Sequence, residues 1–195
     1  MQSAAARKQL IEDLLSFSRL NTAERTFENN DLAVLVEEVK TELKEVMEEK
    51  HAVIEATELC RVNIIPFQFR QLMHNLLSNA LKFSKTGTSP HIIIKSKIEK
   101  GSDLNNIKSV LQTGRISPVR DYCHISIADN GIGFDPQYKD QIFEVFQRLH
   151  GKEEYSGTGI GLSIVKKIVE NHNGIITATS EPGKGTTFDI YIPAR

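Results

Sequence analysis

The sequence is poor in cysteine, because Cys60 and Cys123 are the only two among its 195 residues. Two cysteines are too few for a disulfide framework, and neither has the CxxC or His-rich neighbourhood of a metal site. Long apolar runs are missing too: none approaches the ~20 residues of a membrane-spanning helix, and residues 1–8 lack the apolar core of a signal peptide. We therefore expect a cytoplasmic chain in a reducing compartment, without membrane contact of its own, whether or not a longer parent protein is membrane-attached.

An excess of charge of one sign is absent as well. The 24 Lys and Arg residues balance 25 Asp and Glu residues, for a formal net charge of -1. No block of like charges occurs, which argues against nucleic acid as a partner and against a polybasic membrane anchor. The chain does have 39% hydrophobic residues, over a length that suits one large or two small domains with a real core.

Hydrophobic periodicity divides the chain into a short N-terminal helix and a larger domain. Apolar residues recur at helical spacing in residues 4–20, which predicts an amphipathic helix that needs a partner for its apolar face. Residues 22–30 are polar and resemble a linker. Asp31 is a good N-cap for one helix that carries apolar residues as far as Met47, and we place the domain boundary there.

The rest of the domain mixes strands and helices without a regular βαβ alternation. Residues that alternate or cluster as in strands are found at 52–56, 60–64, 91–98, 122–128, 175–180 and 186–192, and helical periods at 66–84 and 159–171. This order favours an α+β layer sandwich over a Rossmann-type sheet. Residues 99–121 make a long connection, which we interpret as an extended hairpin or a mobile loop.

The helix expected around residue 75 has a distinctive polar face. Asn75, Asn79 and Lys82 stand at i, i+4 and i+7, so they share one side of the helix. An ordinary amphipathic helix with a solvated polar face is the simpler interpretation. Asn is a poor helix former, however, and two of them one turn apart favour amide groups that hold a metal or phosphate oxygen.

Glycines cluster in residues 129–133, 157–161 and 183–185. Glycine lets backbone N–H groups close around an anion, so a Gly-rich turn that leads into a helix is a candidate phosphate cradle. Tight turns between strands are the alternative, which we prefer for 183–185. The second cluster is not a dinucleotide fingerprint, because no strand leads into it, and the GxxxxGK[ST] pattern of a P-loop is absent.

Taken together, these motifs resemble the conserved boxes of sensor histidine kinases. Asn75–Phe83 resembles the N box, Asp129–Phe134 the first glycine box and Ile142–Phe146 the F box. Gly157–Leu162 resembles the second glycine box and Gly183–Phe188 the last. Each motif alone is weak, but all of them stand in the family's order.

The resemblance covers about residues 31–195, as a catalytic, ATP-binding domain of the GHKL superfamily with an ATP lid at about 134–161. It implies the Bergerat fold, a two-layer α/β sandwich in which a mixed sheet packs on helices. Residues 1–21 resemble the closing part of the second helix of a dimerisation hairpin, which leaves 22–30 as the linker. Phe146–His150 is most similar to the lid of phytochrome-like and other hybrid sensor kinases.

The resemblance also implies roles for individual residues. Asp129 would accept a hydrogen bond from the adenine amino group, which guanine lacks at that position, and Thr187 would support the same edge. Asn79 is the implied Mg²⁺ ligand, with Asn75 beside it. The ammonium group of Lys82 would lie next to the phosphates and stabilise their negative charge.

The implied lid is hinged at glycines and anchored by Phe143 and Phe146, with Arg148 as a contact to the γ-phosphate. The N–H groups at the start of the following helix would face the phosphates. The implied catalytic residues are Asn75, Lys82 and Arg148. The implied ATP-binding residues are Asn75, Asn79, Lys82, Phe83, Asp129, Gly131, Gly133, Phe134, Gly157, Thr158, Gly159, Ile160, Gly161, Leu162 and Thr187, with Asn79 and Asn75 holding Mg²⁺.

The residue at position 75 indicates the type of reaction. Related ATPases of the gyrase, chaperone and mismatch-repair type carry a Glu four residues before the metal-binding Asn, where it activates water, and this chain has Asn75 there. An amide cannot accept a proton at neutral pH, so hydrolysis by this route is lost. The implied reaction is transfer of the γ-phosphoryl group to a histidine in two-component signal transduction.

No histidine here has the His-acidic-Pro context of a phospho-acceptor, so we expect no autophosphorylation by this chain alone.

The implied partners are the dimerisation and phosphoacceptor domain of a parent kinase, a second copy in a homodimer, and the receiver domain of a response regulator. Two other functions stay open. One is an ATP-binding sensor or interaction module without transfer activity, which the missing acceptor favours. The other is a stand-alone GHKL-type ATPase or a protein kinase of the anti-sigma type; Asn75 disfavours the ATPase, and the remnant of a dimerisation hairpin disfavours both.

Overall fold

The computed structural model describes residues 4–22, 26–104, 116–149 and 157–194. Its strands are β1 (Glu28–Asp31), β2 (Val53–Thr57), β3 (Arg61–Ile64), β4 (His91–Lys100), β5 (Asp121–Asp129), β6 (Ile175–Glu181) and β7 (Gly185–Pro193). Its helices are α1 (Ala4–Thr22), α2 (Leu32–Glu42), α3 (Lys44–Glu49), α4 (Pro66–Lys82), α5 (Gly101–Leu104) and α7 (Gly161–Asn171), with the 3-10 turns η1 (Pro136–Tyr138) and η2 (Gln141–Phe143). The strands and helices that the sequence predicts are present, with ends that differ by a few residues.

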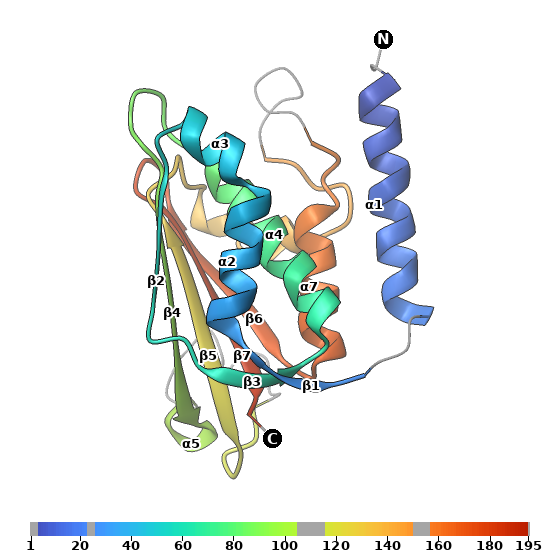
Figure 1. The fold of residues 1–195 in the computed structure, drawn as a ribbon, viewed down its shortest axis with the longest axis vertical. Helices are drawn as coiled ribbons and strands as arrows, with labels where there is room; N and C mark the ends of the chain where they lie inside the picture. The colour runs from blue at the N-terminus through green and yellow to red at the C-terminus, as the bar shows by residue number, and fades with distance from the viewer. Residues whose placement is uncertain (1–3, 23–25, 105–115, 150–156, 195) are drawn as a thin grey trace.

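A five-stranded mixed sheet forms one layer, in the order β2-β4-β5-β7-β6, and α2, α4 and α7 cover one of its faces (Figure 1). β2 and β4 are parallel, whereas the other neighbours are antiparallel. Alternate residues of the central strands are fully buried in the core, among them Ile94, Ile125 and Ile190. This pattern is expected for a sheet with one covered face, and it confirms the predicted two-layer α/β sandwich.

Two segments depart from the sequence prediction. Residues 28–30, assigned to the linker, form β1 together with the N-cap residue Asp31, and this strand pairs antiparallel with β3. All four residues are polar, so hydrophobic periodicity could not reveal the strand. The single helix expected to reach Met47 is broken at Leu43, whose φ of -94° and ψ of 5° separate α2 from α3. An apolar period that continues across a bend gives no sign of the break.

The long connection between β4 and β5 lies partly within the described residues. β4 continues to Lys100, and the short helix α5 follows it directly. Leu104 of α5 packs with Tyr122, Ile175 and Tyr191 in a small second apolar cluster. The predicted hairpin or mobile loop falls mainly on residues 105–115, which lie outside the described residues.

α1 lies beside α7 and is anchored at its C-terminal end (Figure 1). Leu20 is buried, and Asn171 Nδ2 donates a hydrogen bond to Leu20 O at 3.1 Å. Ile11, Leu14 and Leu15 stay exposed, so part of the apolar stripe of α1 is uncovered by the described residues. In these same ranges, no helix combines the length and the hydropathy needed to cross a bilayer.

His172 connects α4 with α7 inside the core. Its Nε2 accepts a hydrogen bond from Ile65 N at 2.9 Å, and its Nδ1 donates to Ile168 O at 2.7 Å, which fixes the neutral tautomer with the proton on Nδ1. Ile65 is the N-cap residue of α4. Phe27 and Phe69 lie edge-on against the ring. The role of His172 is therefore structural.

The substitution His172→Phe tests this role, because it keeps a ring of similar shape but leaves the buried Ile65 N–H without an acceptor. We expect the free energy of unfolding to fall by about 2 kcal/mol, the usual cost of an unsatisfied buried donor. Urea unfolding measures the loss. The control is His51→Asn, at an exposed turn position with a φ of 51° that Asn tolerates. Equal stability of His172→Phe and the wild type would contradict the assignment.

Candidate functional site

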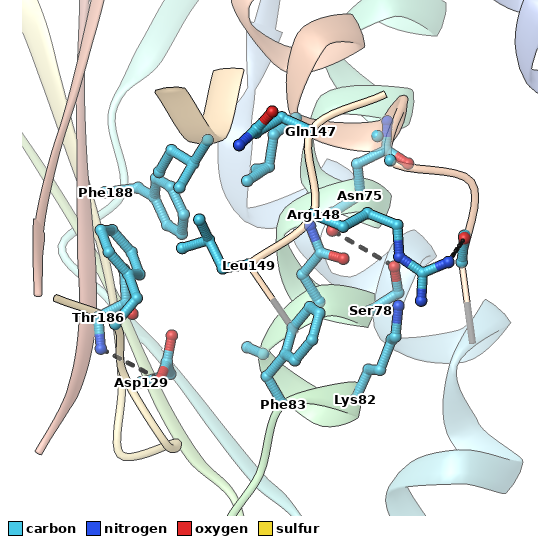
Figure 2. A pocket seen from close by; sticks show the side chains of 18 of the residues that line it. Asn75, Ser78, Lys82, Phe83, Asp129, Gln147, Arg148, Leu149, Thr186 and Phe188 are labelled. Carbon is cyan, nitrogen blue, oxygen red and sulfur yellow. Dashed lines mark hydrogen bonds between the residues drawn. The ribbon is translucent and has the colours of Figure 1, made fainter. Parts of the chain in front are cut away.

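A cavity of about 370 Å³ lies between α4, the end of β5, the start of β7 and the start of α7 (Figure 2). Its volume is typical of a small-molecule site. The lining residues are Asp13, His74, Asn75, Ser78, Asn79, Ala80, Lys82, Phe83, Asp129, Ile132, Gly133, Phe134, Ile142, Gln147, Arg148, Leu149, Gly157, Thr158, Gly159, Gly161, Leu162, Thr186 and Phe188. Segments far apart in the sequence therefore meet at one site, and most of the predicted site residues are among them.

The polar face of α4 contributes one wall. The residues Asn75, Ser78, Asn79 and Lys82 all line the cavity, whereas Leu77 on the opposite side of the helix is buried in the core. The sequence left open whether this face meets water or a ligand. The structure turns this face toward the cavity, which favours the ligand-binding interpretation.

Asp129 ends β5 with its carboxylate in the cavity. Its Oδ1 accepts a hydrogen bond from Gly131 N at 2.8 Å. The same oxygen accepts a second one from Thr186 N at 3.2 Å (Figure 2). No donor among the described residues binds Oδ2, which is therefore the oxygen that a ligand can reach. Burial raises the pKa of this carboxyl above its ordinary value, and the two N–H donors and Lys85 offset only part of the effect.

Two glycines let the backbone close around Asp129. A Cβ added to Gly131 would lie 2.6 Å from Phe83 O and 2.8 Å from Asp129 Oδ1. Gly185 has a φ of 110°, and a Cβ there would lie 2.0 Å from Asp129 O. A side chain at either position would displace the strand end. Gly131 is not itself a lining residue, so its role is this close approach rather than contact with a ligand.

The threonine in the cavity is Thr186, not the expected Thr187. Thr187 pairs with Ala128 in the sheet and does not line the cavity. Side chains alternate along a strand, so an error of one residue exchanges the faces. Ser180 braces this corner: its Oγ lies 3.0 Å from Thr186 Oγ1 and accepts a hydrogen bond from Phe134 N at 2.9 Å.

Asn130 is a supporting residue that the sequence analysis missed. Its Oδ1 accepts a hydrogen bond from His91 N at 2.9 Å, and its Nδ2 donates to Ser89 O at 3.1 Å. These two bonds tie the end of β5 to the start of β4 and so position Asp129. The available signal was its place directly after Asp129 in the first glycine cluster.

Lys82 and Arg148 form a positive end of the cavity, across from Asp129 (Figure 2). Arg148 Nη1 donates to Gly157 O at 2.9 Å, and Lys82 Nζ lies 4.6 Å from the centroid of the Phe83 ring. Burial and, next, the charge of Arg148 lower the pKa of Lys82. An anion bound between the two cations would relieve this repulsion.

The second glycine cluster leads into α7 at the same end. Gly157, Thr158 and Gly159 line the cavity, together with the first α7 residues Gly161 and Leu162. The N–H groups at a helix start have no intrahelical acceptor, which makes this place suitable for an anion. The predicted site residue Ile160 is fully buried in the core instead, so its side chain anchors the segment.

One of the two residues expected to anchor the predicted lid packs into the core. Phe143 is buried and meets Phe188 edge-on at 6.3 Å between ring centroids. Phe146 is 58% exposed with a φ of 65°, so the prediction that it anchors the lid is wrong. Its backbone is in the left-handed region, and its N–H donates a hydrogen bond to Gly159 O at 3.0 Å. Residues 150–156 of the predicted lid lie outside the described residues.

Lining residues that the sequence did not single out come mainly from the lid. Ile142, Gln147 and Leu149 face the cavity, as does His74, which directly precedes the segment that resembles the N box. Ile, Gln and Leu side chains carry no distinctive chemistry, so their positions within or beside the motifs were the available signal.

Asp13 of α1 also reaches the cavity. Thr158 Oγ1 donates a hydrogen bond to Asp13 Oδ2 at 2.5 Å, and Asp13 is a lining residue. The two residues stand 145 positions apart, so no local pattern predicts the contact. The helix that precedes the domain therefore places a carboxylate beside the glycine segment.

Asn75 offers a direct test of what the cavity suits. Its Nδ2 is buried and has no hydrogen-bond partner among the described residues. A buried donor without a partner costs roughly 1–3 kcal/mol, and a phosphate oxygen would satisfy it. The described residues contain no group of three or more His, Cys, Asp or Glu that could hold a metal ion. A cation that brings phosphate and water ligands needs only one or two protein oxygens, and the amides of Asn75 and Asn79 fit that demand.

Comparison with known proteins agrees with these observations. A family model described as "Histidine kinase-, DNA gyrase B-, and HSP90-like ATPase" matches residues 65–195. The phytochrome-like protein Cph1 of Synechocystis sp. is 35% identical over 184 residues, which cover 94% of this chain and 22% of that protein. The aerobic respiration control sensor protein ArcB of Escherichia coli is 32% identical over 130 residues, 65% of this chain and 14% of that protein. The chain thus spans about a fifth or less of these relatives' length.

Solved structures share the fold. Full-length ShkA in complex with AMPPNP has a TM-score of 0.72 at 24% identity, over 94% of this chain and 35% of that chain. The catalytic domain of histidine kinase ThkA in a nucleotide-free form has a TM-score of 0.62 at 25% identity, over 88% of this chain and 99% of that chain.

The substitution Asp129→Asn tests how much the buried charge of this carboxylate destabilises the fold. An amide oxygen can accept the same two N–H groups without burying a charge. Because the folded-state pKa of Asp129 is raised, ionisation disfavours the folded state above that pKa, and this cost fades as pH falls through it toward the ordinary value of 3.8. We expect the variant to be more stable than the wild type at neutral pH, with a difference that shrinks on acidification.

Urea unfolding over a pH series measures this difference. The matched control is Asp121→Asn, at the exposed start of the same strand, which should not change stability in this pH-dependent way. A loss of stability in Asp129→Asn at neutral pH would contradict the account of Asp129 as a buried charge kept at a cost.

Proposed function

The chain belongs to the family of histidine kinase-, DNA gyrase B- and HSP90-like ATPases, and on that premise we propose that it binds Mg²⁺-ATP and transfers the γ-phosphoryl group to a histidine. Its relatives include phytochrome-like and other sensor proteins, as the motifs predicted. One observation carries the proposal: a single cavity has a buried carboxylate at one end and two cations beside a glycine-rich helix start at the other. The carboxylate end suits the neutral base of a nucleotide, and the cationic end suits its polyphosphate.

The Asp129 end suits adenine. Its Oδ2 can accept a hydrogen bond from the 6-amino group of adenine. Guanine presents a carbonyl oxygen at that position, so two hydrogen-bond acceptors would face each other. Ile132, Phe134, Leu149 and Phe188 supply apolar surface for the base. Recognition by a buried acceptor is selective, because the wrong base would leave the carboxylate buried and unpaired.

The opposite end suits a triphosphate. Lys82 and Arg148 supply positive charge, the start of α7 supplies N–H groups, and Asn75 Nδ2 supplies a donor that is otherwise unsatisfied. Mg²⁺ held by Asn79 would neutralise part of the phosphate charge. The neighbouring ShkA structure was solved with AMPPNP, an ATP analogue, which supports nucleotide binding in a domain of this fold.

The side chains favour transfer over hydrolysis. Position 75 carries an amide, which cannot take a proton from water at neutral pH. Charge stabilisation by Lys82 and Arg148 and positioning by the lid are sufficient contributions for phosphoryl transfer to a nucleophile that is already reactive, such as imidazole. The acceptor histidine would belong to the dimerisation domain of a longer parent kinase, which then passes the phosphoryl group to the receiver domain of a response regulator. The exposed stripe of α1 is consistent with homodimer formation in that parent.

Supplying an acceptor in trans distinguishes the candidate functions. The chain is mixed with a dimerisation hairpin from a phytochrome-like kinase, Mg²⁺ and γ-labelled ATP. We expect acid-labile, base-stable label on the hairpin, absent when its histidine is replaced and reduced at least about tenfold in Asp129→Asn, as expected for loss of a charge-assisted hydrogen bond. Nucleotide binding without label would favour a sensor module instead. Steady phosphate release without any acceptor would favour an ATPase.

Asp13 is expected to oppose nucleotide binding. Its carboxylate lies beside Thr158 at the phosphate end, and like charges a few ångströms apart repel by about 1 kcal/mol in water. Asp13→Asn keeps an acceptor for Thr158 but removes the charge. We expect ATP to bind about fivefold more tightly and adenosine to bind unchanged.

Calorimetric titration at low and high salt measures both affinities, and the ATP effect should shrink with salt because the interaction is electrostatic. Glu12→Gln, an exposed neighbour on the same helix, is the matched control. Equal or weaker ATP binding by Asp13→Asn would show that α1 does not bring this charge to the phosphates.

A further inference from the structure

The only two cysteines of the chain come together in the fold, away from the nucleotide cavity. Cys60 precedes β3 and Cys123 is near the start of β5, and neither lines the cavity. Along β5, Cys123 lies six residues from Asp129, or about 20 Å at the rise of a strand. Neither the proposed reaction nor the proposed binding site uses these thiols.

Ser96 of β4 connects the two thiols. Its Oγ donates to Cys60 Sγ at 3.1 Å and accepts from Cys60 N at 2.7 Å. In the sheet, Ser96 is opposite Ile125 and Ile98 is opposite Cys123, so Ser96 and Cys123 are diagonal neighbours. Both are buried on the inner face, and Cys60 is close enough to Cys123 to influence the pKa of the Cys123 thiol.

The two thiols differ in access to solvent. Cys60 is partly exposed, whereas Cys123 is fully buried. Burial, and then the proximity of Cys60, raise the pKa of the Cys123 thiol well above its ordinary value. Cys60 is therefore the thiol that a dissolved oxidant reaches first, and Cys123 is placed to react with the product.

We propose that Cys60 and Cys123 are a reversible oxidation site that closes to an intramolecular disulfide with hydrogen peroxide. The Cys60 thiolate attacks one peroxide oxygen and becomes a sulfenic acid, and the other oxygen leaves as water after taking a proton. Cys123 sulfur then attacks Cys60 sulfur, and the sulfenic hydroxyl leaves with the Cys123 proton as a second water. Two thiols and one peroxide thus give one disulfide and two waters. A dithiol reductant reverses the step by exchange.

The bond would tie the turn before β3 to β5 across the edge of β4. Such a cross-link restricts the unfolded chain, so the oxidised protein should unfold at a higher urea concentration than the reduced protein. The nucleotide cavity should be unaffected, because it lies at the other end of β5.

The test treats the full chain with a small molar excess of hydrogen peroxide. We expect intact mass to fall by about 2 Da with loss of both titratable thiols, as a disulfide requires. A non-reduced peptide map should show the Cys60 and Cys123 peptides joined, and dithiothreitol should restore both thiols. Cys60→Ser and Cys123→Ser should each abolish the mass loss while leaving ATP affinity within about twofold of the wild type.

Other products would overturn the proposal. These are a gain of about 32 Da on Cys60, which marks sulfinic acid, a Cys60–Cys60 dimer on a non-reducing gel, or two thiols that stay reduced throughout. Ser96→Ala adds a second measurement. If Ser96 supports the reactive thiol, disulfide formation slows severalfold in that variant without a change in the joined peptides.

Discussion

The cavity depends on one constraint, which is that the Asp129 carboxylate is held in a largely buried position. Its Oδ1 is fixed by Gly131 and Thr186, and the strand end is braced through Asn130. Burial raises the pKa of this group, so the fold bears a cost for keeping it charged. A ligand that donates a hydrogen bond to Oδ2 offsets part of the free-energy cost of burying the charge. The same carboxylate therefore destabilises the empty fold and provides the basis of ligand recognition.

The opposite end of the cavity follows the same logic with the other sign of charge. Lys82 and Arg148 are brought close enough for their charges to interact unfavourably, and the glycine segment leaves the start of α7 open beside them. A carboxylate at one end and cations at the other give the site a polar axis. That axis orients a ligand with a hydrogen-bond-donating base and an anionic tail. Asp13 of α1 lies beside Thr158 at the same end, where its charge would act on the anionic tail.

The sequence predicts those features that local patterns encode. The two-layer fold, the shared face of Asn75, Asn79 and Lys82, and Asp129 with its glycines follow from helical period, strand alternation and motif order. Features that depend on register, backbone handedness or distant contacts do not. Thr186 differs from Thr187 by one strand position, and the outward Phe146 depends on a positive φ.

Contacts between distant residues were also out of reach of the sequence. β1 is polar and is fixed only by pairing with β3. Asp13 contacts Thr158, which is 145 positions away in the sequence. The two cysteines come together only because β4 and β5 are neighbours.

The central claim, adenine selectivity through Asp129, is tested most directly by calorimetric titration of the wild-type chain with AMPPNP and GMPPNP, each with and without Mg²⁺. The account predicts Mg²⁺-dependent binding of the adenine analogue, at least about tenfold tighter than the guanine analogue. Equal affinity for both, or no binding of AMPPNP, would contradict it.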